Sequence, residues 1–157
     1  MKVAIGADHR GNEARTHLVQ WLGEQSHGVV EVGPDTDRSC DYPDAAYAVA
    51  NMVASGEADR GILICGTGIG MSIAANKVNG IRAALVHDEI GAELSRRHND
   101  ANVLCMAADT LGLRNFDRIV QTWLTTEFET GGRHDRRIRK IGDIECGGEP
   151  ETGGDAA

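Results

Sequence analysis

A cysteine followed by three alternating glycines is the stretch of this sequence best suited to chemistry. Ile62–Ile64 form a short apolar run, Cys65 ends it, and Gly66, Gly68 and Gly70 follow. Glycines between a strand and a helix let the bare backbone approach a ligand, and the helix start points N–H groups at it. Without the glycines, Cys65 would be interpreted as a small apolar core residue. With them, the pattern predicts an anion-binding loop whose thiol can transfer a proton or act as a nucleophile.

Further polar side chains follow predicted strands or stand at predicted helix ends. The pair Asp8–His9 comes directly after the first apolar run, and His98–Asn99 closes a helical segment before the last one. Arg133 and Arg137 lie four residues apart, so they would share one face of a helix. Two guanidinium groups on one face can bind a phosphate through charge-assisted hydrogen bonds. These positions are therefore candidates for binding an anionic substrate.

Short apolar runs alternate with helical patterns along the chain. The predicted strands are Lys2–Gly6, Val29–Val32, Gly61–Ile64, Ile81–Val86 and Asn102–Met106. The clearest helical stripe is formed by Phe116, Ile119, Val120, Trp123 and Leu124. Such alternation is typical of a parallel sheet covered by helices on both faces. We therefore expect an α/β fold, a three-layer Rossmann-like sandwich with a five-stranded parallel sheet. Its ligand site should lie beyond the carboxyl ends of the strands.

The composition narrows the class of protein and its partners. The 157 residues include 16 Lys and Arg against 24 Asp and Glu, a net charge of -8 that disfavours nucleic acids and anionic membranes. No apolar stretch approaches the ~20 residues of a membrane-spanning helix. The four cysteines show no C-x-x-C spacing, so we expect no disulfide, no structural zinc and a cytoplasmic location. We expect one domain over residues 1–145 and a disordered tail over residues 146–157.

Five motifs occur in order along the chain. They are Gly-Ala-Asp-His at 6–9, Asp-Tyr-Pro at 41–43, Ile-Cys-Gly-Thr-Gly-Ile-Gly-Met-Ser-Ile-Ala-Ala-Asn-Lys at 64–77, Arg-His-Asn-Asp-Ala-Asn at 97–102, and Gly-Gly-Arg-His at 131–134 with Arg137 following. In these motifs the chain resembles the B-type ribose-5-phosphate isomerases. That family includes galactose-6-phosphate and allose-6-phosphate isomerases. The likeness runs from residue 1 to about residue 144 and leaves only the tail outside.

The resemblance implies a reaction and a role for each matching residue. It implies interconversion of an aldose phosphate and a ketose phosphate through an enediolate, without metal or cofactor. Ribose 5-phosphate is the first candidate substrate, and allose 6-phosphate, galactose 6-phosphate or a tetrose phosphate are the alternatives. By this resemblance Cys65 is the base, Thr67 moves a proton between the enediolate oxygens, and His98 opens the sugar ring with help from Asp8. The implied substrate-binding residues are His9, Tyr42, Gly66, Gly68, Ile69, Gly70, Asn99, Arg133 and Arg137.

The family's sites lie between two subunits, so the resemblance also implies a homodimer or tetramer. His98 and Asn99 would then come from the partner subunit.

One position departs from the family's pattern. Several relatives carry an arginine just after the fifth strand that also binds phosphate, whereas this chain has Asp109 there. A carboxylate at this position would repel the phosphate, so the sequence leaves open which sugar phosphate the protein prefers. Arg114 or Arg136 could supply the missing positive charge.

A nucleotide-binding module is the alternative from another class. Gly66, Gly68 and Gly70 superficially match the dinucleotide fingerprint, and Asp88 follows about twenty residues on. However, the third glycine of G-x-G-x-x-G would fall on Met71, and the glycines follow the third predicted strand rather than the first. A Gly-Lys-Ser/Thr phosphate loop is also absent from the sequence. The isomerase interpretation therefore fits the sequence better.

Overall fold

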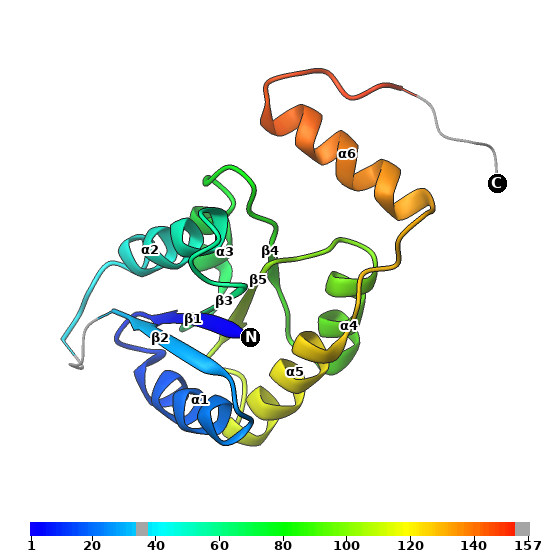
Figure 1. The fold of residues 1–157 in the computed structure, drawn as a ribbon. Helices are drawn as coiled ribbons and strands as arrows, with labels where there is room; N and C mark the ends of the chain where they lie inside the picture. The colour runs from blue at the N-terminus through cyan, green and yellow to red at the C-terminus, as the bar shows by residue number, and fades with distance from the viewer. Residues whose placement is uncertain (34–37, 153–157) are drawn as a thin grey trace.

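A five-stranded parallel sheet forms the centre of the molecule (Figure 1). The computed structural model describes residues 1–33 and 38–152. Its strands are β1 (Lys2–Ala7), β2 (Gly28–Val32), β3 (Arg60–Cys65), β4 (Ala83–Leu85) and β5 (Val103–Ala107), in the spatial order β2-β1-β3-β5-β4. Every neighbouring pair is parallel. The predicted fold class, a three-layer α/β sandwich around a five-stranded parallel sheet, is confirmed.

Two apolar cores, one on each face of the sheet, hold the helical layers. The helices α1 (Asn12–Glu24), α4 (Glu89–Arg97) and α5 (Leu113–Thr125) cover one face, and α2 (Tyr42–Ala54) and α3 (Ile69–Ala75) cover the other. Successive side chains of a strand point to opposite faces. In β3, accordingly, Ile62 and Ile64 enter the first core, whereas Leu63 and Cys65 enter the second. The Cys65 side chain therefore lies on the α2–α3 side of the sheet.

One predicted strand is longer than the strand observed. The strand predicted over Ile81–Val86 is limited to β4, because its partner β5 begins at Val103 and pairs with Ala83. The N–H of Arg82 instead donates to the side-chain oxygen of Asn102 at 2.8 Å. The helix α3 begins at Ile69, directly after Gly68, which turns the chain sharply into the helix.

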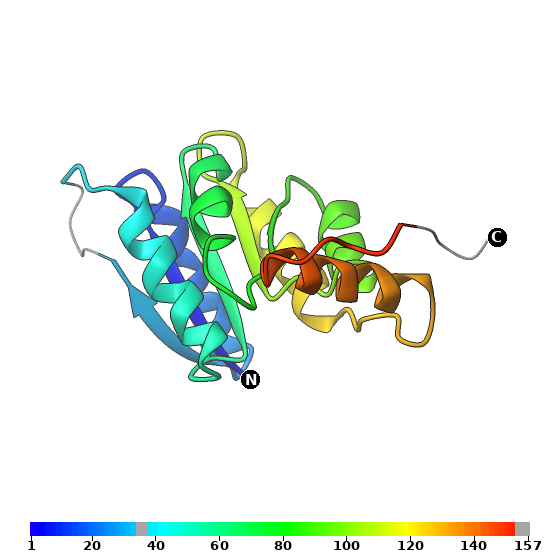
Figure 2. The ribbon, with the colours of Figure 1, turned by 90° about the horizontal axis from the view of Figure 1, so that it is seen from above.

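A sixth helix, α6 (Arg133–Glu145), lies outside the two helical layers (Figures 1 and 2). His134 is its only residue that is buried in this chain, and Ile141 and Ile144 are exposed. Residues 146–152 form no helix or strand, and residues 153–157 of the predicted tail lie outside the described residues. The disordered tail therefore stays a prediction. No helix in the described ranges combines the length and apolar character needed to cross a bilayer.

Candidate active site

The loop after β3 places the Cys65 thiol at the carboxyl edge of the sheet. The strand ends at Cys65, and α3 begins at Ile69 after only three intervening residues. The N–H of Gly68 donates to Cys65 Sγ at 3.1 Å, so the loop folds back over the thiol. Thr67 is exposed at the tip, and its hydroxyl accepts a hydrogen bond from the N–H of Ile69 at 3.3 Å. This loop therefore brings together the base and the proton carrier that the sequence predicted.

Two glycines of this loop leave no room for a side chain. Gly68 has a φ of 72°, in the left-handed region, and a Cβ there would lie 2.5 Å from Leu85 Cδ1. A Cβ on Gly70 would lie 2.6 Å from two ring atoms of Tyr42. The glycine at position 70 thus lets the Tyr42 ring lie against the start of α3. Three predicted site elements, the thiol, the glycines and Tyr42, therefore meet at one place.

The end of β1 brings Asp8 and His9 to the same edge. Ala7 pairs with Ile64, and the N–H of Asp8 donates to the Ile64 carbonyl at 3.2 Å. The Asp8 carboxylate is 7% exposed and accepts hydrogen bonds from the N–H groups of Arg10 and Gly11 at 2.9 and 3.1 Å. In the next residue, His9 Nδ1 accepts a hydrogen bond from the N–H of Cys40 at 3.4 Å. The Asp8 carboxylate therefore stabilises the turn that contains His9.

Asp109 lies at this edge as well, but its partner is one that the sequence did not indicate. Ala107 pairs with Cys65, and the N–H of Asp109 donates to the Gly66 carbonyl at 3.0 Å. The Asp109 carboxylate pairs with Arg10, whose Nη2 lies 2.7 Å from Oδ1. Neither Arg114 nor Arg136 makes this contact. The only signal in the sequence was that Arg10 follows Asp8 and His9, and its pairing across 99 positions could not be deduced from it.

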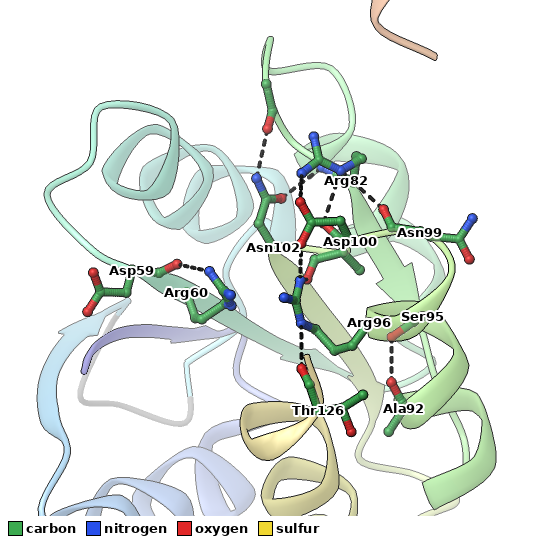
Figure 3. Close-up of polar contacts among 12 residues, drawn as sticks. Asp59, Arg60, Arg82, Ala92, Ser95, Arg96, Asn99, Asp100, Asn102 and Thr126 are labelled. Atoms are coloured by element: carbon green, nitrogen blue, oxygen red, sulfur yellow. Dashed lines mark hydrogen bonds and ion pairs between the residues drawn. The ribbon is translucent and has the colours of Figure 1, made fainter. Parts of the chain in front are cut away.

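A second group of predicted residues surrounds the end of α4. His98 caps this helix, and Asn99 is exposed beyond it. Figure 3 shows the polar contacts of the turn that contains Asn99 and Asp100. Asp100 has a φ of 44°, and its carboxylate pairs with Arg82 at 2.9 Å and Arg96 at 2.7 Å. Arg82 Nε also donates to the carbonyls of Asn99 and Asp100. The backbone that carries His98 and Asn99 is therefore fixed from several sides.

The start of α6 joins this second group. The rings of His98 and His134 stack with centroids 4.1 Å apart and planes 2° apart. Arg133 Nε donates to His134 Nε2 at 3.4 Å, and Arg137 follows one helical turn later. Burial lowers the pKa of His134, and the nearby His98 and Arg133 lower it further. Four predicted site residues thus lie where the end of α4 meets the start of α6: His98, Asn99, Arg133 and Arg137.

This second group also contains possible metal ligands. His98, Glu129 and His134 offer ligand atoms within 4.8 Å of one another, the one such group among the described residues. The imidazole lone pairs lie in their ring planes, and these planes are stacked and nearly parallel, so the pairs do not converge on one point. Nε2 of His134 already accepts a hydrogen bond from Arg133. We therefore assign no metal to this group.

The two groups lie at opposite edges of the sheet. Cys65 ends β3 beside Ala107, the last residue of β5, whereas His98 and Asn99 precede Val103, the first residue of β5. The four steps from Val103 to Ala107, at ~3.3 Å each, separate the two edges by about 13 Å. One copy of the chain therefore does not bring His98 to the Cys65 loop.

Comparison with known proteins places the chain in a family. The family described as Ribose/Galactose Isomerase matches residues 3–141. The chain belongs to this family. A Bacillus subtilis protein provisionally named sugar phosphate isomerase YwlF is 53% identical over 146 residues, which cover 92% of this chain and 97% of that protein. Ribose-5-phosphate isomerase B of Escherichia coli is 46% identical over 144 residues, which cover 92% of this chain and 96% of that protein.

Solved structures of the family agree with the fold described above. Ribose-5-phosphate isomerase B of Clostridium thermocellum superposes on this chain with a TM-score of 0.92 at 48% identity, covering 94% of this chain and 99% of that one. The resemblance drawn from the five sequence motifs is thus confirmed. The family membership favours the isomerase over the nucleotide-binding module. The roles of the individual site residues stay predictions.

Proposed function

We propose that this chain is an aldose–ketose isomerase of sugar phosphates that interconverts ribose 5-phosphate and ribulose 5-phosphate. The observation that carries this proposal is the Cys65 thiol under the glycine loop, within a chain that matches the isomerase family over residues 3–141. Isomerisation needs a base that removes a proton from one carbon and returns it to the next. It also needs donors for the oxygens of the enediolate that forms between these two steps.

The residues at the Cys65 edge supply these groups. In the proposed mechanism the Cys65 thiolate removes the proton from C2 of the open-chain sugar and returns it to C1. The hydroxyl of Thr67 transfers a proton between O1 and O2, and backbone N–H groups of the loop over Gly66–Gly70 stabilise the negative charge on these oxygens. Tyr42 lies against Gly70 and would line the sugar. The turn at Asp8 would hold His9 toward the phosphate.

The residues at the opposite edge supply ring opening and phosphate binding. Pentose phosphates are mostly cyclic, so an acid or base must open the ring before the proton transfer. We assign this step to His98, with Asn99 on the sugar and Arg133 and Arg137 on the phosphate. Because His98 and Cys65 occupy opposite edges of the sheet, these assignments require a second copy of the chain. We therefore propose a homodimer in which each active site takes its Cys65 loop from one subunit and His98 from the other.

Two features of the surface support this assembly. α6 lies outside the helical layers and exposes Ile141 and Ile144, at 43% and 57% exposure. On α3, beside the Cys65 loop, Ile69 and Ile73 are 52% and 58% exposed. Apolar side chains at these positions gain from burial against a second subunit. The same interface would bring Arg133 and Arg137 of one subunit toward the Cys65 loop of the other.

A panel of substrates tests the proposed reaction. The purified protein is assayed with the phosphates of ribose, ribulose, allose, galactose and a tetrose, and its mass is measured by light scattering. We expect the highest kcat/KM with ribose 5-phosphate and ribulose 5-phosphate, and a mass of two chains or a multiple of two. Turnover of a different phosphosugar, without turnover of ribose 5-phosphate, would show that the proposed substrate is wrong. Absence of turnover with every phosphosugar would contradict the isomerase.

A further inference from the structure

A forked ion pair between Arg10 and Asp109 lies across the Cys65 loop. Arg10 Nε is 3.1 Å from Oδ1 and 3.2 Å from Oδ2 of Asp109, and Nη2 is 2.7 Å from Oδ1. The pair joins the turn after β1 to the turn after β5, on the two sides of β3. The Asp109 carboxylate therefore binds the Nε–Nη2 edge of the planar guanidinium and fixes the orientation of that group.

The pair touches the residue next to the proposed base. A Cβ on Gly66 would lie 2.8 Å from Asp109 Oδ2 and 2.9 Å from Arg10 Nε. Gly66 therefore lets both charged groups reach the backbone of the loop. At 57% and 38% exposure the two side chains remain open to solvent, and exposed ion pairs contribute little to stability. The position of this ion pair is therefore better explained by ligand binding than by a contribution to the stability of the fold.

Among the described residues at this edge, Arg10 is the cation that lies beside two carboxylates. Asp8 is a buried carboxylate in the adjacent turn, and Asp109 is a second carboxylate, which is 38% exposed. A phosphate approaching these two groups is repelled unless a cation faces it. Arg10 carries that charge, and no described residue accepts a hydrogen bond from its Nη1. Asp109 thus holds the Nε edge of the guanidinium and leaves the other edge for a ligand.

We propose that Arg10, oriented by Asp109, binds the substrate phosphate beside the Cys65 loop. This inference rests on the proposed sugar phosphate isomerase and names a further residue of its binding site. It also explains the departure at Asp109. Asp109 accepts hydrogen bonds from Arg10, which follows β1, and so orients the cation that binds the phosphate. The phosphate therefore meets positive charge at this edge although position 109 is acidic.

Kinetics and phosphate inhibition of the Arg10→Ala variant test this role. We expect KM for ribose 5-phosphate to rise about tenfold or more with kcat changed less than about threefold, because a phosphate contact binds substrate and transition state alike. The inhibition constant of inorganic phosphate should rise by a similar factor. Arg118→Ala is the matched control, since it removes an exposed arginine whose Nε lies 2.7 Å from Glu89 on the outer helical layer. It should change neither constant.

The exchanged pair Arg10→Asp with Asp109→Arg tests the part played by Asp109. This double variant keeps one cation and one anion at the same place, so most of the lost affinity should return. A double variant as weak as Arg10→Ala would contradict the orienting role of Asp109. If Arg10→Ala melts well below the wild-type protein, Arg10→Gln replaces it, because glutamine keeps part of the aliphatic stem and a polar end group but carries no charge.

Direct binding separates this inference from the proposed reaction. Titration calorimetry with inorganic phosphate and with ribose 5-phosphate needs no turnover. Binding to the wild-type protein that is lost in Arg10→Ala would support the phosphate site, even if neither protein isomerises a sugar. An active wild-type enzyme whose Arg10→Ala variant keeps the same KM and the same inhibition by phosphate would overturn the inference and leave the isomerase intact.

Discussion

The two halves of the candidate site are built in different ways. The Cys65 loop is shaped by its own backbone, since Gly68 takes a left-handed conformation and donates to the thiol three residues before it. The turn at His98–Asn99 is shaped by charged side chains from elsewhere, with Asp100 between Arg82 and Arg96 (Figure 3). A loop of the first kind is encoded by adjacent residues. A turn of the second kind depends on strands and helices that come together only in the folded chain.

The difference also decides how each half responds to substitution. In the glycine loop, a Cβ added at Gly66, Gly68 or Gly70 would lie 2.8, 2.5 or 2.6 Å from a side-chain atom of a residue outside the loop, so the damage is steric. At the His98 turn, Arg96 is 3% exposed and donates to both Asp100 and the Ala101 carbonyl, at 2.7 Å each. Removing its partner leaves a buried charge uncompensated. Steric and electrostatic tests should therefore separate the two halves.

The largest effect is expected from removing the base in the first half. Cys65→Ser keeps the size of the side chain, but a hydroxyl does not ionise in the working pH range. Turnover of ribose 5-phosphate should fall by roughly a thousandfold or more with little change in affinity. Cys146→Ser, at an exposed cysteine after α6, is the matched control and should remain active. A Cys65→Ser protein with more than about a tenth of wild-type turnover would contradict the assignment.

The second half is tested by His98→Asn. If His98 opens the ring, turnover of ribose 5-phosphate should fall about a hundredfold, whereas a tetrose phosphate, which cannot form the same ring, should lose much less. Equal losses on both substrates would argue against ring opening.

Mixed subunits test whether the two halves come from different chains. Cys65→Ser and His98→Asn proteins are each expected to have little activity with ribose 5-phosphate. A mixed dimer should contain one site with both wild-type residues, so mixing should restore part of the activity. Lack of restoration, once mass spectrometry has shown that subunits exchange, would contradict the shared site.

The steric character of the first half is tested by Gly68→Ala. The added Cβ is strained at a φ of 72° and also collides with Leu85 Cδ1 and the Met106 carbonyl carbon. We expect a loss of roughly 2–4 kcal/mol in the free energy of unfolding, measured in urea. Gly56→Ala is the matched control, with a φ of 77° and no heavy atom within 4 Å of the new Cβ. It should cost about 1–2 kcal/mol, and equal losses would show that crowding plays no part.

The electrostatic character of the second half is tested by Asp100→Asn. Asparagine tolerates the left-handed backbone of this position but carries no charge to pair with Arg82 and Arg96. Because Asp100 is 33% exposed, we expect a moderate loss of about 1–3 kcal/mol in the free energy of unfolding. Glu93→Gln removes an exposed pair with Arg97 from the same helix and should leave the melting temperature nearly unchanged. A similar melting temperature for both variants would show that the Asp100 pairs do not hold the turn.

The sequence by itself determined the local features of this protein. Alternating apolar runs predicted the parallel sheet, and the Cys65–Gly70 segment predicted a loop between a strand and a helix, because these patterns involve residues close in the chain. The motifs predicted the family correctly. The strand over Ile81–Val86 was predicted too long, since its length is set by β5 and not by its own apolar residues.

Only the tertiary structure decided where these features lie relative to one another. The strand order β2-β1-β3-β5-β4 makes β5 a parallel neighbour of β3, so Cys65, at the end of β3, and His98, before the start of β5, lie at opposite edges of the sheet. The same order brings Arg10 to Asp109, 99 positions away, and packing of α6 against the end of α4 stacks His134 on His98. Such contacts depend on which strands become neighbours, a choice made by burial over the whole chain. No pattern within a short stretch of sequence records that choice.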